Sequence, residues 1–474
     1  MKVLLAGSEA LPFVKTGGLA DVLGALPKEL RRLGVDARVM IPLHKTVKTN
    51  YQNKLEFVAD TKLKLGWREI YMGILKMEYS GVPCYFIDCE DFFGDEVYRG
   101  GDAENEQYLY FCRAVLTAIE LTKFIPDVIH CNDWHTGMIP MLLKTQYSQS
   151  SLSKIKSVFT IHNIKFQGKM DFTLMKDMLD IPQSFYNPQG VEADGCANMM
   201  KTGIVYADKI TTVSPTYAKE ILTDWYGMGL DGVLRSREHD LCGIVNGIDA
   251  EEFDPLTDSA LVKNYGPETM KDKWSNKKDL REYFSLGCNL YTPILSMVTR
   301  LTSQKGLDLV RHVLEELLQG DICFVLLGSG DKEFEDYFNY IAAKHPDKSG
   351  VHIGYNEELA RRIYAGADFL LMPSRFEPCG LSQMIAQRYG TLPIVRETGG
   401  LIDTVLPWNE FSGVGDGFSF AAYNAHDMLN AIRYALSVFG NKASLRRLKK
   451  NAMLKDNSFL LSAGQYLELY KSLV

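Results

Sequence analysis

The stretch Lys15-Thr16-Gly17-Gly18-Leu19-Ala20-Asp21-Val22 joins a predicted strand to a predicted helix near the start of the chain. A short apolar run, Lys2–Ala6, precedes it, and an amphipathic stretch, Leu19–Leu33, continues from it. Glycines at such a junction let backbone N–H groups approach a phosphate at the helix N-terminus, and Lys15 adds a full positive charge. The third glycine of the dinucleotide fingerprint is absent, which disfavours a dehydrogenase. A purely structural turn is the alternative.

Short apolar runs alternate with longer amphipathic stretches along the rest of the chain, which is typical of a doubly wound parallel sheet. Further strands are expected at Ala37–Ile41, Cys84–Ile87, Val128–His130 and Val158–His162, and again at Ile294–Thr299, Cys323–Leu327, Phe369–Met372 and Pro393–Val395. Helices are expected at Glu106–Lys123, Gly306–Leu318, Lys332–Lys344, Glu357–Ala365 and Leu381–Tyr389. Residues 254–285 are charged and weakly periodic, which predicts a surface helix after a hinge.

The second half repeats the opening stretch as Glu397-Thr398-Gly399-Gly400-Leu401-Ile402-Asp403-Thr404. Both stretches place two glycines at a loop-to-helix junction, so two similar nucleotide-binding halves explain the echo. We predict an α/β fold with two Rossmann-like, doubly wound domains. The first comprises residues 1–242 together with a C-terminal helix, 457–474, and the second comprises residues 243–456.

The composition is that of a globular protein, with 474 residues, 46% hydrophobic and 23% charged. The net charge of −7 disfavours a nucleic-acid or membrane-surface binder. The nine scattered cysteines form no zinc pattern and indicate reduced thiols in the cytoplasm. The apolar run Val3–Ala6 is too short for a signal-peptide core.

Cationic and acidic side chains follow two predicted strands of the second half. Arg300 and Lys305 lie in Arg300-Leu301-Thr302-Ser303-Gln304-Lys305-Gly306, and fixed cations there suit a departing diphosphate. Two solvated surface charges are the alternative. Glu377 lies in the loop Pro373–Ser382 and is expected to meet sugar hydroxyls, unless it only starts a helix. No metal-binding Asp-x-Asp pair follows a strand, which favours a metal-independent reaction.

Polar clusters follow strands of the first half as well. Asn132-Asp133-Trp134-His135 and His162-Asn163 come after neighbouring strands, and an aromatic beside a carboxylate is a frequent sugar-binding arrangement. Structural histidines and a core tryptophan are the alternatives. Asn246, in Asn246-Gly247-Ile248-Asp249, lies between the halves as hinge, sugar contact or both.

Together these segments resemble the bacterial glycogen synthases and plant starch synthases. The match runs in order through Lys-Thr-Gly-Gly-Leu at 15–19, Asp-Trp-His at 133–135, Ile-His-Asn at 161–163, Val-Asn-Gly-Ile-Asp at 245–249, Arg-Leu-Thr-Ser-Gln-Lys-Gly at 300–306 and Ser-Arg-Phe-Glu-Pro-Cys-Gly-Leu at 374–381. The resemblance implies a retaining GT-B glycosyltransferase, whose two Rossmann-like domains face each other across a deep cleft. It also implies transfer of glucose from ADP-glucose to the non-reducing end of an α-1,4-glucan, with no cofactor.

The resemblance assigns roles to the matching positions. Lys15 and Gly18 would contact the diphosphate or the adjoining sugar, and Arg300 and Lys305 would neutralise the leaving group. The N–H groups of Cys379, Gly380 and Leu381 and the hydroxyl of Ser382 would help them. Glu377, His162 and Asn246 would hold the glucose, Tyr355 would stack on the base, and Asp133 would approach the acceptor.

Three departures from the family pattern matter. Ser382 replaces a common Thr and keeps the hydroxyl, whereas Ile385 stands where related retaining transferases often carry a second Glu. Asp456-Asn457-Ser458-Phe459 stands where relatives commonly have Ser-Trp, which makes the docking of the last helix on the first domain less secure.

Two alternatives remain open on the sequence. One is another GT-B transferase, with sucrose or a lipid-sugar as product. The sequence has no basic amphipathic helix, which disfavours a lipid acceptor. The other is a non-catalytic glucan-binding protein, which would have no need for Arg300, Lys305 and Glu377 together.

Overall fold

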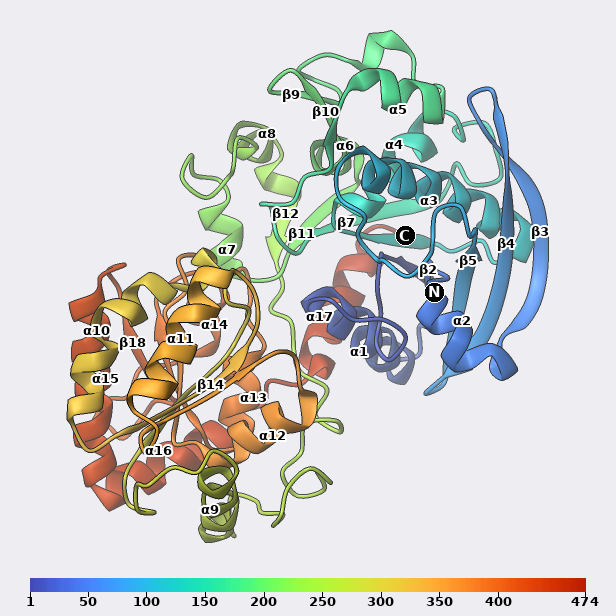
Figure 1. Cartoon of the computed structure of the whole chain (residues 1–474). Helices are drawn as coiled ribbons and strands as arrows, with labels where there is room; N and C mark the ends of the chain where they lie inside the picture. The colour runs from blue at the N-terminus through green and yellow to red at the C-terminus, as the bar shows by residue number, and fades with distance from the viewer. The chain divides into compact units, whose positions relative to one another are not determined.

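The computed structural model describes residues 1–474, which divide into two compact units. Unit 1 comprises Met1–Gly247 and Phe459–Val474, and unit 2 comprises Ile248–Ser458 (Figure 1). The structure places the first crossing after 247 rather than 242 and the second after 458 rather than 456. The chain stays with unit 1 beyond 242 because Leu241–Gly243 pairs with a strand of that unit and Ile244 packs in its core.

The main sheet of unit 1 has nine strands in the order β12-β11-β7-β6-β1-β2-β5-β4-β3. Their bounds are β12 Leu241–Gly243, β11 Lys209–Thr212, β7 Lys156–Ile161, β6 Val128–Asn132, β1 Lys2–Ala6, β2 Asp36–Pro42, β5 Val82–Asp88, β4 Arg68–Tyr79 and β3 Glu56–Leu65. The first seven in that order run parallel, and β4 and β3 extend the sheet as an antiparallel hairpin that the sequence analysis missed. A small second sheet contains β8 (Lys169–Met170), β10 (Cys196–Asn198) and β9 (Glu192–Ala193).

Helices cover both faces of the main sheet of unit 1 (Figure 1). On one face, α1 (Gly18–Arg32) packs beside α17 (Phe459–Lys471), and on the other lie α3 (Gly101–Thr122) and α4 (Met138–Lys144). Shorter helices are α2 (Lys45–Tyr51), α5 (Phe172–Leu179), α6 (Met199–Tyr206), α7 (Pro215–Glu220) and α8 (Asp231–Ser236). None of the helices in the chain combines the length and the apolar character that a membrane span requires.

The C-terminal helix docks on unit 1 despite the unusual residues before it. Phe459, Tyr466 and Tyr470 are buried in the core that α1 shares with β1 and β2. The Tyr470 hydroxyl lies 2.7 Å from Nδ1 of the buried His130 on β6. Aromatic side chains of the helix itself therefore provide the contact that the missing Ser-Trp pair left in doubt.

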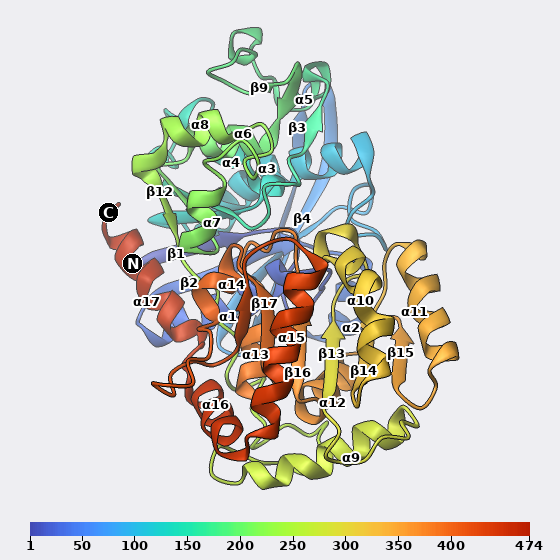
Figure 2. The same cartoon turned by 90° about the vertical axis from the view of Figure 1, so that its left-hand side faces the viewer.

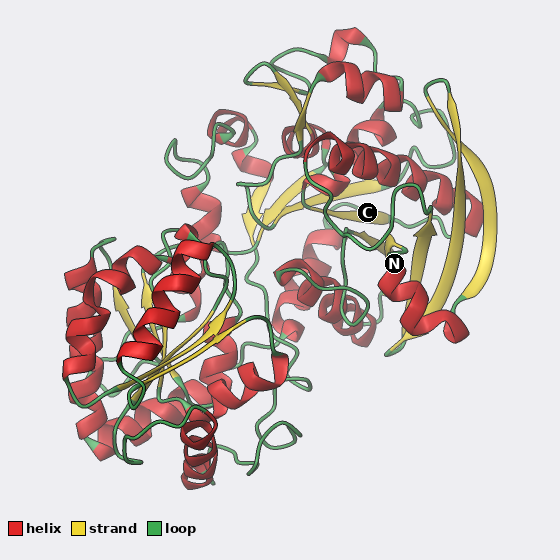
Figure 3. Cartoon of the chain, in the orientation of Figure 1, coloured by secondary structure: helices red, strands yellow, loops and turns green.

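Unit 2 is built on six parallel strands in the order β15-β14-β13-β16-β17-β18. Figure 3 shows this sheet in yellow among the red helices of the unit. Their bounds are β15 Ser349–Ile353, β14 Cys323–Gly328, β13 Ile294–Val298, β16 Phe369–Met372, β17 Leu392–Arg396 and β18 Phe418–Phe420. This is the strand order of a Rossmann fold, in which the first and fourth strands lie side by side. The predicted α/β class, with two doubly wound Rossmann-like domains, is confirmed.

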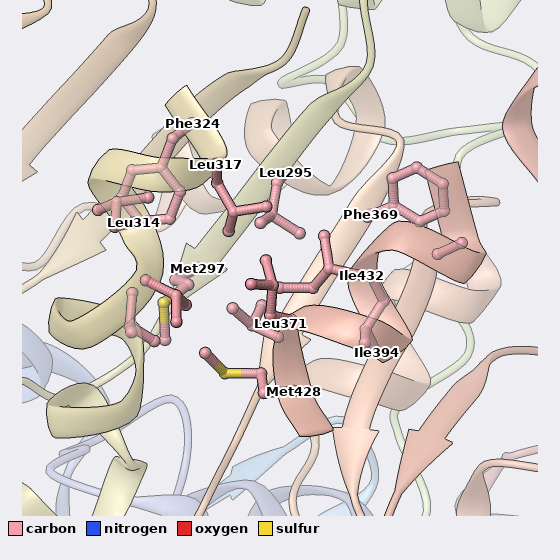
Figure 4. Packing of buried hydrophobic residues seen from close by; sticks show 14 of the residues in the cluster. Leu295, Met297, Leu314, Leu317, Phe324, Phe369, Leu371, Ile394, Met428 and Ile432 are labelled. Atoms are coloured by element: carbon pink, nitrogen blue, oxygen red, sulfur yellow. The ribbon is translucent and has the colours of Figure 1, made fainter. Parts of the chain in front are cut away.

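Alternation along the strands of unit 2 creates a core on each face of the sheet. Phe324 and Leu326 point to one face, where α10 (Leu307–Gln319), α11 (Lys332–Lys344), α15 (Ala425–Gly440) and α16 (Lys442–Leu454) cover them. Figure 4 shows Leu314, Leu317 and Ile432 closing on this face, and Figure 2 shows α10 and α15 in front of the sheet. Val325 and Leu327 point the other way, toward α9 (Lys273–Tyr283) and α12 (Glu357–Gly366).

One expectation for unit 2 is wrong. Residues 254–285 are not one surface helix, because only Met270–Asp272 and Lys273–Tyr283 are helical and the preceding segment is anchored by buried Tyr265, whose hydroxyl donates to the Tyr389 carbonyl at 2.7 Å. Cys288 and Cys323 lie side by side, and the other seven cysteines are free thiols.

A buried charge cluster ties α9 and α16 to the sheet of unit 2. Asp368, just before β16, accepts hydrogen bonds from Lys277 at 2.6 Å and from Lys449 at 3.1 Å. Burial would raise the pKa of Asp368, but Lys449 and Lys277 outweigh it and hold that pKa below its ordinary value.

Replacing Asp368 with Asn is expected to destabilise the protein by about 3–5 kcal/mol, since two buried ammonium groups lose their only carboxylate. The matched control is Glu316→Gln, which breaks an exposed pair with Arg433 and should cost less than about 1 kcal/mol. Urea unfolding followed by circular dichroism measures both. Equal midpoints for the two variants would contradict the expectation.

Candidate active site

The carboxyl edge of β13 is the topological switch point of unit 2, because β13 pairs with β14 on one side and with β16 on the other. Lys305 follows β13 and Glu377 follows β16. Their side chains form an ion pair with Nζ to Oε2 at 2.7 Å, and Glu377 is buried. The Ser374 hydroxyl donates to the same Oε2 at 2.8 Å. The structure therefore brings together two residues that the sequence analysis expected on the diphosphate and on the sugar.

Hydrogen bonds also join the two loops that carry Lys305 and Glu377. Arg375 N donates to the Gln304 carbonyl at 2.8 Å, and the Gln304 amide donates to the Phe376 carbonyl at 3.2 Å. Gly306 adopts φ +69°, and a Cβ there would lie 2.0 Å from the Pro373 carbonyl oxygen. Glycine is therefore required for the close approach that sets Lys305 beside Glu377.

The other expected residues of unit 2 lie after the carboxyl ends of β13, β15 and β16. Arg300, two residues after β13, is exposed. Cys379 and Gly380 belong to the loop between β16 and α13 (Ser382–Arg388), which begins at Ser382. Tyr355 follows β15 and is 74% exposed.

Unit 1 has the corresponding switch point between β1 and β6, which are neighbours in the sheet. Lys15 follows β1, and its ammonium pairs with Asp21 of α1 at 2.8 Å. Gly17 caps α1 and Gly18 is its first residue, as the glycine pair predicts. The second glycine pair behaves alike, since α14 (Gly400–Thr404) begins at Gly400.

Asp133 and His162 lie together after β6 and β7. Asp133 is buried and its Oδ1 accepts from the His162 backbone N–H at 2.8 Å. Burial raises the pKa of Asp133 to about 7 and lowers that of His162 to about 3, so the imidazole is neutral. Asn132 uses its amide NH₂ on two carbonyls, so its Oδ1 accepts from His162 Nε2 at 2.9 Å. This leaves Nδ1 of His162 as the ring nitrogen with a lone pair for a ligand.

Glu9 is a member of this edge that the sequence analysis missed. It follows β1, is buried, and accepts hydrogen bonds from the backbone N–H and the hydroxyl (2.8 Å) of Thr16. Burial raises its pKa to about 7. The available signal was a carboxylate three residues after the first buried strand, as Asp133 is a carboxylate that follows β6.

Two further features of unit 1 concern sugar contacts. Asn246 is buried, and its Oδ1 has no hydrogen-bond partner in the structure. A cavity of about 490 Å³ opens beside Trp134. Its lining includes one exposed aromatic ring, Phe166, and polar side chains of Glu104, Asn105, Gln167 and Lys169. Trp134 itself is buried, so the core alternative holds for most of its surface.

Two Rossmann-like units with charged groups at their switch points are the architecture expected of a GT-B glycosyltransferase, and the family comparisons show that class. Residues 2–236 match the family model of the starch synthase catalytic domain, and residues 280–455 match that of glycosyl transferases group 1. The glycogen synthase of Geobacillus thermodenitrificans is 50% identical, with 100% of this chain and 98% of the relative covered. The glycogen synthase of Clostridium botulinum is 48% identical, covering 100% and 99%.

A solved structure supports the same placement. The catalytic domain of starch synthase IV from Arabidopsis thaliana, bound to ADP and acarbose, matches with a TM-score of 0.93 at 31% identity, covering 100% of this chain and 99% of that one. The chain belongs to the glycogen and starch synthase family, and its activity is that of a glucosyltransferase of the glycogen synthase type.

Proposed function

We propose that the enzyme transfers glucose from ADP-glucose to the non-reducing end of an α-1,4-glucan, with retention at the anomeric carbon. The observation that carries the donor assignment is the Lys305–Glu377 pair at the switch point of unit 2. A cation beside a carboxylate suits a sugar diphosphate, which has an anionic part and a hydroxyl-bearing part side by side. Starch synthase IV, the structural relative, is bound to ADP and to acarbose.

The residues divide between leaving group and sugar. Arg300, Lys305 and the N–H groups of the loop that begins α13 stabilise the diphosphate as its charge grows. Lys15 and Gly18 contact the diphosphate or the adjoining sugar, as the family resemblance implies. Glu377, Asn246 and Nδ1 of His162 orient the glucose, and Tyr355 stacks on the base. The loop groups are those of Cys379, Gly380 and Leu381 together with the hydroxyl of Ser382.

The chemistry proceeds on one face of the sugar. The bond from C1 to the phosphate oxygen breaks, and the 4-hydroxyl of the acceptor bonds to C1 on the same face. The departing phosphate oxygen takes the hydroxyl proton, so a good leaving group needs no protein acid. Retention through two carboxylates would need a nucleophile opposite Glu377. Position 385, where related retaining transferases often carry a second Glu, is Ile.

The acceptor glucan is assigned to unit 1. Asp133 approaches the acceptor, and the cavity beside Trp134 supplies hydrogen-bonding groups with the Phe166 ring, which suits a sugar chain. We place the enzyme in the cytoplasm because seven of its cysteines are free thiols. Nucleic acid and membrane are not among the proposed partners.

Glucose transfer in excess chelator tests both the donor and the independence from metal. We expect radiolabelled glucose to pass from ADP-glucose to glycogen at an unchanged rate in EDTA, because side chains supply the positive charge. Transfer of glucose only from another nucleotide-sugar would contradict the assignment of ADP-glucose as the donor. Loss of transfer in EDTA, with recovery on adding Mg²⁺ or Mn²⁺, would contradict the phosphate site.

A further inference from the structure

Four consecutive carbonyl groups of the loop after β16, those of residues 377–380, accept hydrogen bonds from two donors. Gly400 N donates to the carbonyls of Glu377 at 3.0 Å and of Pro378 at 3.1 Å. The Gln383 amide nitrogen donates to the carbonyls of Cys379 at 3.1 Å and of Gly380 at 3.0 Å. Two donors, one from α14 and one from α13, thus turn the whole row of carbonyls in one direction.

The orientation of these carbonyls determines where the next N–H groups point. In a planar trans peptide the C=O and the following N–H point in opposite directions, and the one cis bond of the chain is Leu11–Pro12. With the carbonyls of 378, 379 and 380 directed at the supports, the N–H groups of Cys379, Gly380 and Leu381 point away from them. Successive N–H groups on one side of a loop form a concave anion-binding surface.

We propose that Gln383 and Gly400 are positioning residues that present these three N–H groups to the donor diphosphate. The inference rests on the proposed function, which places the diphosphate at this loop. Neither residue touches the ligand. They act through the backbone of the loop.

The supports are themselves linked and closely packed. The Thr404 hydroxyl accepts from the Gln383 amide at 2.9 Å and donates to the Gly400 carbonyl at 2.6 Å. A Cβ at Gly400 would lie 2.4 Å from both Cα and O of Cys379, so only glycine permits this approach. Gly380, at φ +76°, leaves the space that the Gln383 side chain occupies. Gly400, the second residue of the second glycine pair, therefore holds the loop after β16 in place.

The test compares Gln383→Met with Gln387→Met in the full-length enzyme. Gln387 lies one turn further along α13 and is equally buried, but its amide donates to the Thr404 carbonyl and to Asp416, away from the loop. Both variants lose buried amide hydrogen bonds. We expect Gln383→Met alone to lower kcat/KM for ADP-glucose by about 10²-fold and to weaken ADP binding, with KM for glycogen unchanged. Turnover per folded molecule in Gln387→Met should stay near that of the wild type.

Gly400→Ala and Gly366→Ala provide a second comparison, which decides the matter if Gln383→Met does not fold. A Cβ at Gly366 meets Leu280 and the Asn276 carbonyl of α9 instead of the loop. A lower kcat/KM for ADP-glucose and weaker ADP binding in Gly400→Ala, but not in Gly366→Ala, would support the proposal. Equal values in Gln383→Met and Gln387→Met, or in Gly400→Ala and Gly366→Ala, would overturn it. The wild type separates this failure from that of the proposed function. If the wild type binds ADP and uses ADP-glucose while the paired variants agree, only the positioning role is wrong.

Discussion

Replacing Arg300 with alanine is expected to lower turnover with ADP-glucose by a factor on the order of 10²–10³, while the fold survives. The side chain is exposed at the end of β13, so its loss leaves no buried group unpaired. On the proposed function, the charge it removes is one that stabilises the departing diphosphate as the glycosidic bond breaks. Turnover at saturating ADP-glucose and glycogen, normalised to folded protein by circular dichroism, measures the effect.

The matched control for this prediction is Arg433→Ala. Arg433 is also an exposed arginine of unit 2, and it pairs with Glu316 between α15 and α10. Turnover should not change in this variant. Near-normal turnover in folded Arg300→Ala would show that Arg300 is one of the solvated surface charges considered as the alternative.

The variant Glu377→Gln is expected to lose turnover by a comparable factor, on the order of 10²–10³. The substitution keeps the size of the side chain but removes the charge that lies 2.7 Å from Lys305. Without that carboxylate, the ammonium is drawn toward the diphosphate in the ground state, and the sugar loses its charged hydrogen-bond acceptor. Thermal unfolding should change less than activity, since the Lys305 side chain is 15% exposed and water reaches it.

A double variant separates catalysis from a structural ion pair. In Glu377→Gln with Lys305→Met, both charges are gone, so any stability lost through an unpaired charge should return. We expect turnover to remain low, because neither the sugar contact nor the diphosphate contact is restored. Recovery of turnover together with stability would show that the pair only holds the loop. The control is Glu397→Gln. Glu397 follows β17 and accepts a hydrogen bond from the Ser419 hydroxyl, and turnover should not change in this variant.

The central strands were predictable because parallel strands buried on both faces have continuous apolar sequences. All nine expected strands are present, and the polar motifs follow the carboxyl ends of six of them, β1, β6, β7, β13, β16 and β17. The hairpin β3–β4 was missed because it is an edge of the sheet, where exposed lysines such as Lys62 and Lys64 interrupt the apolar pattern. The segment 254–269 was mistaken for helix because its anchor, Tyr265, is held by the carbonyl of Tyr389 from a distant helix end.

The candidate site was predictable to a smaller extent. Lys305 and Glu377 were identified singly, but their ion pair joins residues 72 positions apart. The pair Gly399-Gly400 is visible in the sequence as an echo of Gly17-Gly18, but only the structure shows that Gly400 N donates to the carbonyls of Glu377 and Pro378 and packs against Cys379. Gln383 was not identified, because no local pattern marks a glutamine inside a helix as part of a site. Glu9 was not identified although it follows the first buried strand, because only its burial in the folded protein separates it from an ordinary loop carboxylate.

The amino-acid sequence by itself determined the class of fold, the two Rossmann-like halves and the loops that hold the charged groups. It could do so because apolar periodicity and glycine at loop-to-helix junctions are local properties of the chain. The tertiary structure decided which of these groups meet: Lys305 with Glu377, Asp133 with the backbone of His162, and Gln383 and Gly400 with the carbonyls of one loop. These contacts depend on the order in which strands pair and on close backbone approach, and both arise only when distant segments pack together.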